Sequence, residues 1–425
     1  MVKHPARTLL LVFLAALAVR LVFVGARYTD DLSAFQTGDY TLYWIGADHI
    51  LSQGDLSNSL FLLRPPLFAA VIAVLDLDNL AVLLCNVVLG ALLAPLSVIL
   101  ARQLTLGSRA ALVVGLIVAL DPASVVYSAF LGPEPLANLT FLGMPIMLLH
   151  AVLVCRGGRA LLWGSVAGLL LALSTLTRPA PYLVWIPLAL WLLVFYRAQW
   201  RTVTVYVLVG LIGIGAWVAH NARVFDNPTV SSVGAYSMLY YRAASVEHWG
   251  ADHDMDTVYT DLARRVEARL GHDTSQVSTM TRHSHYSGPD TLTNAMTATA
   301  LDTFQRYPAA YIATLPVGLA RMYGYTSALP RWTRVLEVPW NLALTLGALA
   351  GVVIAARRRA WLLAIGTALP VLYYTAGTLF VQTSGMDTRM RTMLTPFLAV
   401  GLVVAAGWVA AWRSGQSEDR DVPAG

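Results

Sequence analysis

The sequence predicts an all-α polytopic membrane protein, a bundle of about ten transmembrane helices. Of its 425 residues, 57% are hydrophobic and only 12% are charged, whereas soluble proteins carry about 25% charged residues. The mean hydropathy is +0.61. Several apolar runs also exceed the ~18 residues that cross a hydrocarbon core about 30 Å thick.

The predicted spans form a large group in the first half of the chain and a smaller group near its end. The first group is 8–24, 80–104, 110–130, 132–154, 161–176, 182–196 and 203–219. The second group is 338–356, 360–380 and 393–412. Asp121-Pro122 is expected to break the third span, because proline removes a helical hydrogen bond. Arg20 is expected to snorkel from the first span to the membrane interface.

A long loop, residues 27–79, follows the first span. Residues 40–51 within it have helical periodicity with one apolar face, which predicts a helix lying along the membrane interface. Gly54 follows as a stop signal, because glycine readily adopts the left-handed conformation of a helix end. Residues 66–75 are apolar but too short to span a bilayer.

The longest polar segment, residues 220–308, precedes the last spans. Apolar residues recur there at intervals of four in two stretches, which predicts two amphipathic helices. The stretches are Val258, Leu262 and Val266, then Leu292, Met296, Ala300 and Phe304, which Pro308 ends. Residues 311–325 are moderately apolar but contain Pro316 and Arg321, so we expect an interfacial or re-entrant helix there.

The distribution of arginines orients the chain. If residues 311–325 do not span, both termini and the arginine-rich loops fall on one side, which the positive-inside rule assigns to the cytoplasm. We therefore expect a multi-pass protein of the cytoplasmic (inner) membrane, with the loops at 27–79, 220–335 and 381–392 on its outer face. The net charge of +5 fits this topology and contact with membrane lipids, and we expect no nucleic-acid partner.

These boundaries divide the chain into four parts. Residues 1–219 form a transmembrane module whose outer loop 27–79 carries the chemistry, and residues 220–335 form an outer-face region with amphipathic helices. Residues 336–412 are the C-terminal spans, and residues 413–425 are a polar cytoplasmic tail predicted to be disordered. Charged residues that interrupt the apolar pattern are costly near a bilayer and indicate function. They gather on the outer side: Asp39, Arg64, Glu134, Arg178, Arg223, Arg389 and Arg391.

The outer loop carries an ordered motif: Asp39, Tyr43, Ala47, Gly54-Asp55 and Arg64-Pro65-Pro66. This order resembles the first outer loop of GT-C glycosyltransferases, the lipid-phosphosugar-dependent enzymes that include the protein O-mannosyltransferases (glycosyltransferase family 39) and the bacterial aminoarabinose transferase acting on lipid A. Later stretches also resemble that family: Glu134-Pro135, Leu176-Thr177-Arg178-Pro179, His220-Asn221 and Arg389-Met390-Arg391. Many relatives have a second acid where Tyr40 stands and a lysine where Arg64 stands, which leaves donor and acceptor identity open.

The resemblance implies a GT-C-type helical bundle and an integral membrane glycosyltransferase of the cell envelope. It implies that a sugar moves, with inversion, from a polyprenyl-phosphate donor to a lipid, glycan or protein acceptor. Asp39 would be the general base. Arg64 is the first candidate for the donor phosphate, because guanidinium matches phosphate oxygens. Further phosphate-binding candidates are Arg178 and Arg223, and the substrate-binding candidates are Tyr43, Glu134, His220, Asn221, Tyr240 and Tyr241. The resemblance implies no metal and no cofactor.

Each candidate also has a structural interpretation. Asp39 suits the N-cap of the interfacial helix. Arg178 and Arg223 suit arginines that anchor helix ends, and tyrosines suit the aromatic belt of a membrane protein. The acidic and histidine residues between 247 and 285 offer metal ligands, but their spacing matches no known metal loop. A solvated acceptor-binding loop is the preferred interpretation of that segment.

Three other functions compete with a glycosyltransferase. A transporter or flippase of lipid-linked sugars would show internal repeats and broken helices in matching halves, and the sequence shows no repeat. A non-catalytic subunit of a surface-polysaccharide assembly system would share the hydropathy without needing Asp39 and Arg64 in register. A hydrolase would need a motif such as Gly-x-Ser-x-Gly, which is absent.

Overall fold

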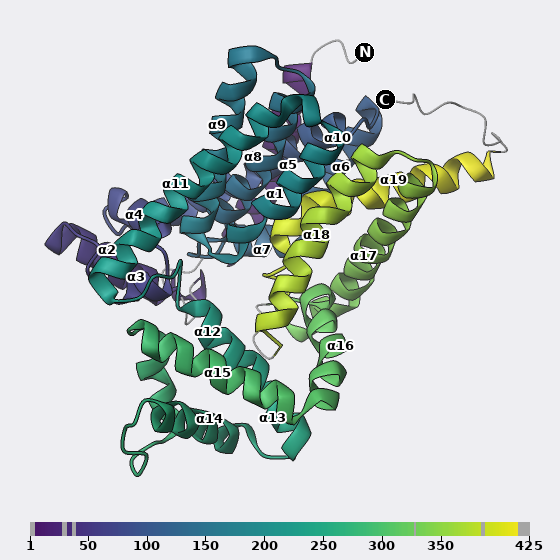
Figure 1. The fold of residues 1–425 in the computed structure, drawn as a ribbon. Helices are drawn as coiled ribbons and strands as arrows, with labels where there is room; N and C mark the ends of the chain where they lie inside the picture. The colour runs from purple at the N-terminus through teal and green to yellow at the C-terminus, as the bar shows by residue number, and fades with distance from the viewer. Residues whose placement is uncertain (1–4, 28–31, 36–39, 327–328, 384–386, 415–425) are drawn as a thin grey trace.

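The computed structural model describes residues 5–27, 32–35, 40–326, 329–383 and 387–414. These residues form helices and turns, and none of them lies in a β-strand, so the all-α prediction is confirmed. Figure 1 shows long helices packed as a bundle, with shorter helices gathered at one end of it. The predicted tail 413–425 falls almost entirely outside the described residues.

Within the described part of the chain, eight helices are long and apolar enough to cross a membrane. They are α1 (Pro5–Arg27), α5 (Asn79–Gln103), α8 (Glu134–Leu153), α9 (Gly157–Thr177), α11 (Trp200–Phe225), α17 (Arg334–Arg357), α18 (Trp361–Val381) and α19 (Thr395–Arg413). The pair α6 (Ser108–Leu120) and α7 (Pro122–Ser128) makes a ninth, bent span. The chain is therefore a multi-pass membrane protein.

A shorter apolar helix, α10 (Trp185–Phe195), follows a 3₁₀ turn and falls short of the nine candidate spans in length. Helices α9 and α11 run parallel, since Gly164 lies against the Thr202 carbonyl and Gly168 against the Tyr206 carbonyl. The segment between two parallel helices must return across the bundle. The apolar helix Ala180–Phe195 lies in that segment, and its helical rise of about 24 Å is short for a span. Figure 1 accordingly places the start of α1 and the end of α19 at the same end of the bundle.

The predicted break at Asp121-Pro122 is a bend of 54° between α6 and α7. The Asp121 carboxylate caps α7 by accepting from the Ser124 backbone N–H at 3.0 Å and the Ser124 hydroxyl at 2.7 Å. It also accepts from the Arg391 guanidinium at 3.0 Å. The carboxylate therefore satisfies the helix end that the proline exposes.

Arg20 does not snorkel to the interface, contrary to the expectation from sequence. Its side chain is fully buried beside α7, where Nε donates to the Ser128 hydroxyl at 2.9 Å. Its Nη1 donates to the carbonyls of Ala16 at 3.0 Å and Ala119 at 3.3 Å. Acceptors within the bundle replace the water that snorkelling would have reached.

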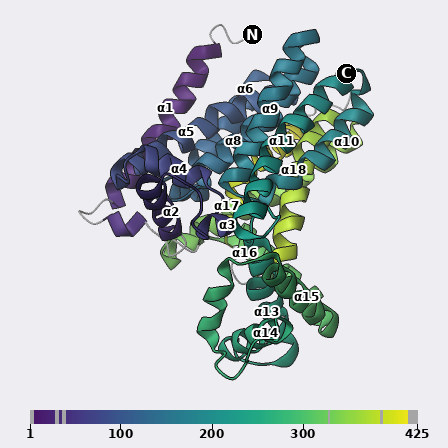
Figure 2. The same ribbon diagram turned by 60° about the vertical axis from the view of Figure 1, so that its left-hand side comes forward.

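The first loop contains α2 (Thr41–Gln53), α3 (Leu60–Leu63) and α4 (Leu67–Val74). Helix α2 confirms the predicted helix at 40–51, with Tyr43 and Ala47 buried, and it ends at Gly54 with φ 75° as expected. Helix α4 is apolar and short, also as predicted. Figures 1 and 2 show the three helices gathered at one end of the bundle.

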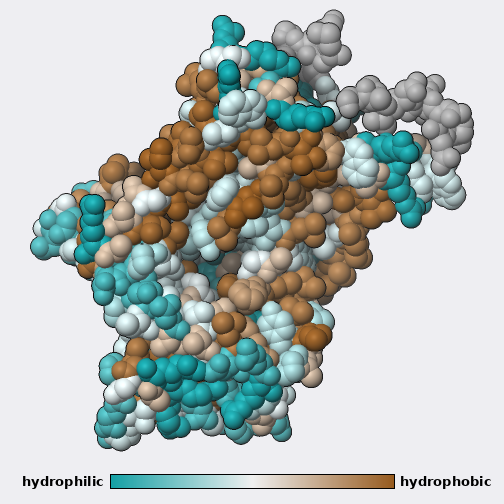
Figure 3. Space-filling view, viewed as in Figure 1, coloured by the Kyte–Doolittle hydropathy of each residue, from teal (hydrophilic) through white to brown (hydrophobic). Residues whose placement is uncertain are grey.

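A second group of helices, which we call the cap (residues 232–306), packs around its own hydrophobic core. It contains α12 (Val233–Ser237), a π-helical turn at Met238–Ala243, α13 (Ala244–Ala251), α14 (Met255–Arg269) and α15 (Asp290–Arg306). The predicted apolar stripes of α14 and α15 lie in this core. Figure 3 shows the cap as a hydrophilic mass beyond the hydrophobic band of the bundle.

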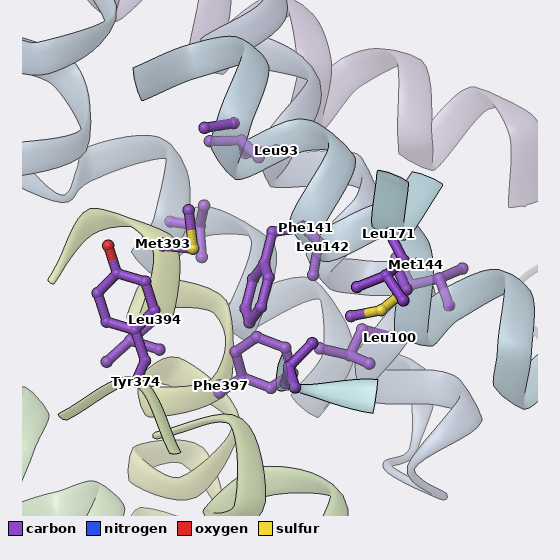
Figure 4. Close-up of a cluster of buried hydrophobic side chains, with 14 of the residues drawn as sticks. Leu93, Leu100, Phe141, Leu142, Met144, Leu171, Tyr374, Met393, Leu394 and Phe397 are labelled. Carbon is purple, nitrogen blue, oxygen red and sulfur yellow. The ribbon is translucent and has the colours of Figure 1, made fainter. Parts of the chain in front are cut away.

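Helix α16 (Pro308–Gly324) joins the cap to α17. It falls short of the length and hydropathy that define the nine candidate spans of the described chain, which agrees with the predicted non-spanning helix at 311–325. Close packing then ties α17 to α19, because a Cβ at Gly351 would lie 1.9 Å from the Gly401 carbonyl oxygen. Figure 4 shows the neighbouring contact of α8 with α19, where the rings of Phe141 and Phe397 lie 6.2 Å apart.

Candidate active site

A cavity of about 180 Å³ lies between the end of the bundle and the cap. Its lining comes from segments far apart in the sequence: the first loop, the start of α8, the end of α9, the cap and the residues before α19. Its charged lining residues are Arg64, Glu134, Arg178 and Arg389. The loops that the topology predicted to share one face therefore meet at one site.

The carboxylate of Glu134 lies at the centre of the charged side of the cavity. It opens α8 between Pro133 and Pro135, and it is 1% exposed. Its Oε1 accepts from Arg178 Nη1 at 3.1 Å and lies 3.9 Å from Arg389 Nε. A buried carboxylate is tolerated only when it is paired in this way.

Tyr40 completes the surroundings of this carboxylate. Its hydroxyl donates to Glu134 Oε2 at 2.9 Å. Burial, and then the charge of Glu134, raise the pKa of Tyr40 well above its usual value, so the phenol stays protonated and donates. Gly132 permits this approach, because a Cβ there would lie 2.4 Å from both the Tyr40 ring and the Glu134 carboxylate.

Arg178 enters the cavity at the turn that follows α9. It is extended, with φ −142° and ψ 128°, as expected for a residue before proline. Besides its ion pair with Glu134, its Nη2 lies 3.6 Å from Met390 Sδ. The predicted candidates Glu134 and Arg178 are thus direct partners.

Arg64 lines the cavity from the turn between α3 and α4. This turn is held against the start of the cap, where the Ser231 hydroxyl donates to the Leu63 carbonyl at 2.7 Å. The Ser232 N–H donates to the Leu62 carbonyl at 2.9 Å. Arg64 is therefore fixed at the boundary between the first loop and the cap.

Arg389 is a lining residue that was not among the predicted site residues. Its N–H donates to Asp387 Oδ1 at 2.7 Å, just before α19 begins. Two residues later, the buried Arg391 pairs with Asp121 and donates to Asn341 Oδ1 at 2.9 Å. The Arg389-Met390-Arg391 stretch was the available signal, but the sequence does not reveal which of its arginines faces the cavity.

Tyr43 and Tyr241 line the cavity, and Tyr40, Tyr236 and Tyr286 join them there. Tyr240 does not line it, although we predicted a substrate contact for this residue. It is fully buried in the cap, and its hydroxyl lies 2.6 Å from His285 Nδ1. In the π-helical turn, Tyr241 therefore faces the cavity, whereas its neighbour Tyr240 lies in the core of the cap.

Three other predicted candidates also lie away from this cavity, in the last two turns of α11. The His220 ring stacks on Trp217 with centroids 4.9 Å apart, and its Nε2 lies 3.2 Å from the Leu56 carbonyl. Asn221 is buried and donates to the Thr229 carbonyl at 2.8 Å. Arg223 is exposed at the end of the helix. The contacts described for His220 and Asn221 are structural.

Asp39, the predicted general base, lies outside the described residues, as do Asp30 and Asp31. Its neighbour in the chain, Tyr40, lines the cavity. Among the described residues, no group of three or more histidine, cysteine, aspartate or glutamate side chains is placed to hold a metal. In the 247–285 segment, Glu247 pairs with Arg265 and His285 contacts Glu267.

No protein-family model and no curated protein matches the chain. Among solved structures, it is similar to the archaeal oligosaccharyltransferase AglB from Archaeoglobus fulgidus in complex with an inhibitory peptide and a dolichol-phosphate. The TM-score is 0.58 at 12% identity, over 99% of this chain and 52% of that chain. The apo form of the same oligosaccharyltransferase gives a TM-score of 0.55 at 13% identity, over 99% and 53%.

The chain has the GT-C fold. The GT-C resemblance stated from sequence is therefore confirmed for the fold. The chain spans about half the length of AglB, to which it is similar. A third solved structure, ArnT from Cupriavidus metallidurans bound to undecaprenyl phosphate, is closer to this chain in length. Its TM-score is 0.39 at 16% identity, over 96% of this chain and 80% of that one.

Proposed function

We propose that this chain is an integral membrane glycosyltransferase that moves a sugar from a polyprenyl-phosphate donor to a lipid, glycan or protein acceptor. The observation that carries the proposal is the cavity at the end of the bundle, where Arg64, Arg178 and Arg389 converge on a space that one buried carboxylate, Glu134, shares. Three guanidinium groups against one carboxylate suit a phosphate better than a neutral ligand.

The position of the cavity suits a lipid donor. A phosphate held there lies beside the apolar ends of the bundle helices, so an attached polyprenyl chain can remain among the spans. The fold supports the same class, because AglB was solved with a dolichol-phosphate. An acceptor can approach from the polar side, where the cap lies.

In the proposed reaction, an acceptor hydroxyl attacks the anomeric carbon of the donor. The new bond joins the acceptor oxygen to this carbon, and the bond from the carbon to the phosphate oxygen breaks. Asp39 takes the acceptor proton, and polyprenyl phosphate leaves with the electron pair. The arginines stabilise the charge that develops on the leaving phosphate. Direct displacement inverts the anomeric centre.

We place the reaction on the outer face of the cytoplasmic membrane. The support is the positive-inside rule, because Arg102, Arg109, Arg156 and Arg159 lie at or beside the connections from α5 to α6 and from α8 to α9, at the end of the bundle away from the cavity. This end of the bundle also holds the start of α1 and the end of α19.

The test is sugar transfer in membranes that carry the wild type or Asp39→Asn at equal expression, with labelled polyprenyl-phosphate sugars as donors. Loss of the general base is expected to lower the rate about 10²–10⁴-fold while donor binding persists. Asp48→Asn is the matched control, because Asp48 lies on the same loop, is exposed and is not among the cavity's described lining residues.

Unchanged transfer in Asp39→Asn would move the base to another residue, with Asp30 and Asp31 tested next. Absence of transfer from every donor, with labelled lipid instead exchanged between the leaflets of the membrane, would refute the enzyme and favour a flippase. A wild type that neither transfers sugar nor binds polyprenyl phosphate would point to a non-catalytic assembly subunit.

A further inference from the structure

The cavity has two chemically different sides. The charged lining residues come from the first loop, from the bundle and from the residues before α19. The residues that the cap contributes are all uncharged: Val233, Tyr236, Ser237, Tyr241 and Tyr286. Gln382, at the end of α18, borders the cap side, and its Nε2 lies 3.5 Å from the Ser237 hydroxyl.

Three tyrosines, which we call the tyrosine platform (Tyr236, Tyr241 and Tyr286), form most of the cap side. The ring of Tyr236 lies 4.7 Å from that of Tyr286 and 5.9 Å from that of Tyr241. The Ser232 hydroxyl donates to the Tyr286 carbonyl at 2.7 Å and fixes the loop that carries this ring. The platform therefore offers aromatic faces and phenol hydroxyls at fixed positions.

A second layer of side chains supports the platform from behind. The Tyr240 ring packs on Tyr236 with centroids 4.9 Å apart. Its hydroxyl contacts His285 Nδ1, and His285 Nε2 contacts Glu267 at 2.6 Å. These charged and polar groups stand behind the tyrosines and are not among the residues that line the cavity. A ligand on the platform meets only neutral groups of the cap.

A sugar suits such a surface. Its C–H faces pack on aromatic rings, and its hydroxyls exchange hydrogen bonds with phenol, amide and serine groups. A charged sugar would need a counter-charge on this side, because leaving a buried charge unpaired is costly. The cavity's one described lining carboxylate, Glu134, is already paired with Arg178 and Tyr40 on the opposite side.

We propose that the donor's sugar is uncharged and lies on the tyrosine platform, while the donor's phosphate lies against the arginines. This inference rests on the proposed function and deepens it, because it assigns the class of sugar. It excludes uronic acids and sugars with a free amino group as preferred donors. It also assigns Tyr241 and Tyr286 a specificity role.

The experiment measures lipid binding to the full-length protein in nanodiscs. The probes are polyprenyl phosphate without sugar and the same lipid carrying a neutral hexose, a uronic acid or an amino sugar. The test variant is Tyr241→Phe with Tyr286→Phe, which keeps both rings. Tyr259→Phe is the matched control, because Tyr259 belongs to the cap but is not among the lining residues.

The double variant is expected to bind the neutral hexose lipid about tenfold more weakly, the loss of one or two hydrogen bonds. Its affinity for the sugar-free lipid is expected to change less than about twofold, which also shows that the variant folds. The control is expected to bind both lipids as the wild type does. The wild type is expected to bind the neutral hexose lipid more tightly than either charged-sugar lipid.

Two results would overturn the inference and leave the proposed function standing. One is that the double variant loses affinity for the sugar-free lipid and the hexose-bearing lipid equally, or loses affinity for neither. The other is tighter wild-type binding of a uronic acid or amino sugar lipid than of the hexose lipid. A wild type that binds none of the four lipids would instead refute the proposed function, and the inference with it.

Discussion

Replacing Glu134 with glutamine tests whether the charged side of the cavity is built around this carboxylate. Glu134→Gln keeps the shape of the side chain and an oxygen that can accept the Tyr40 hydroxyl. It removes the negative charge that faces Arg178 at 3.1 Å and Arg389 at 3.9 Å. We expect lower stability, because two guanidinium groups then face each other without a counter-charge.

Removing one partner of a buried ion pair costs roughly 3–5 kcal/mol. Arg178 and Arg389 keep 15% and 18% of their side chains exposed, so water screens part of the repulsion and a cost of about 2–3 kcal/mol is expected. At about 2–4 °C per kcal/mol for a large domain, the unfolding midpoint should fall by roughly 5–10 °C. A bound phosphate should restore part of this loss, because it supplies the missing negative charge.

The assay is thermal unfolding in nanodiscs, with and without polyprenyl phosphate. The matched control is Glu337→Gln. Glu337 is equally buried, but it accepts from neutral groups, the Thr326 N–H at 2.8 Å and the Thr333 hydroxyl. A midpoint for Glu134→Gln equal to that of Glu337→Gln, or a deficit that added polyprenyl phosphate deepens, would refute the reasoning.

Three further outcomes are expected. Arg64→Ala should weaken polyprenyl-phosphate binding about tenfold or more, the loss of a charged hydrogen bond, whereas Arg223→Ala, at an exposed site away from the cavity, should not change it in the same titration. Asp121→Asn should cost about 3–5 kcal/mol in thermal unfolding, because it leaves the fully buried Arg391 without its anion; an unchanged midpoint would contradict this. Hydrogen bonds from two histidines outweigh burial and hold the pKa of Glu267 below its usual 4.5, so its stabilising effect should be full above pH 4.5 and vanish as the pH falls further. The difference in free energy of unfolding between wild type and Glu267→Gln should therefore shrink in acid. A difference that does not change with pH would contradict the lowered pKa of Glu267.

The fold followed from patterns that act locally. Apolar runs fixed the spans, Gly54 ended α2, and Asp121-Pro122 bent the third span. A span was also predicted at 182–196, where the structure has the short apolar helix α10. Arg20 shows the limit of such patterns. Snorkelling is a rule for a single helix, whereas this arginine donates to its own helix, to α6 and to Ser128 on α7, which is more than a hundred residues away.

The site was predictable only in part. The roles of Asp39, Arg64, Glu134 and Arg178 all stay predictions. The last three drew notice because they interrupt apolar or helical patterns, and the structure brings them to one cavity. The tyrosine platform was largely missed, because tyrosine is the residue expected at any membrane interface. Tyr240 and Tyr241 are adjacent in sequence, and only the π-helical turn decides that Tyr241 faces the cavity and Tyr240 the cap core.

Backbone restraint explains why the charges can stay in place without substrate. Arg64 and Arg178 each precede a proline, which disfavours helical geometry and holds the residue extended, as their φ values of −122° and −142° show. Glu134 stands between two prolines at the first turn of α8. Arg389 has no such proline, and the buried pair of Arg391 with Asp121 anchors its segment instead. Charges fixed before the reaction need no reorganisation as a phosphate leaves, which is the condition under which electrostatic stabilisation is most effective.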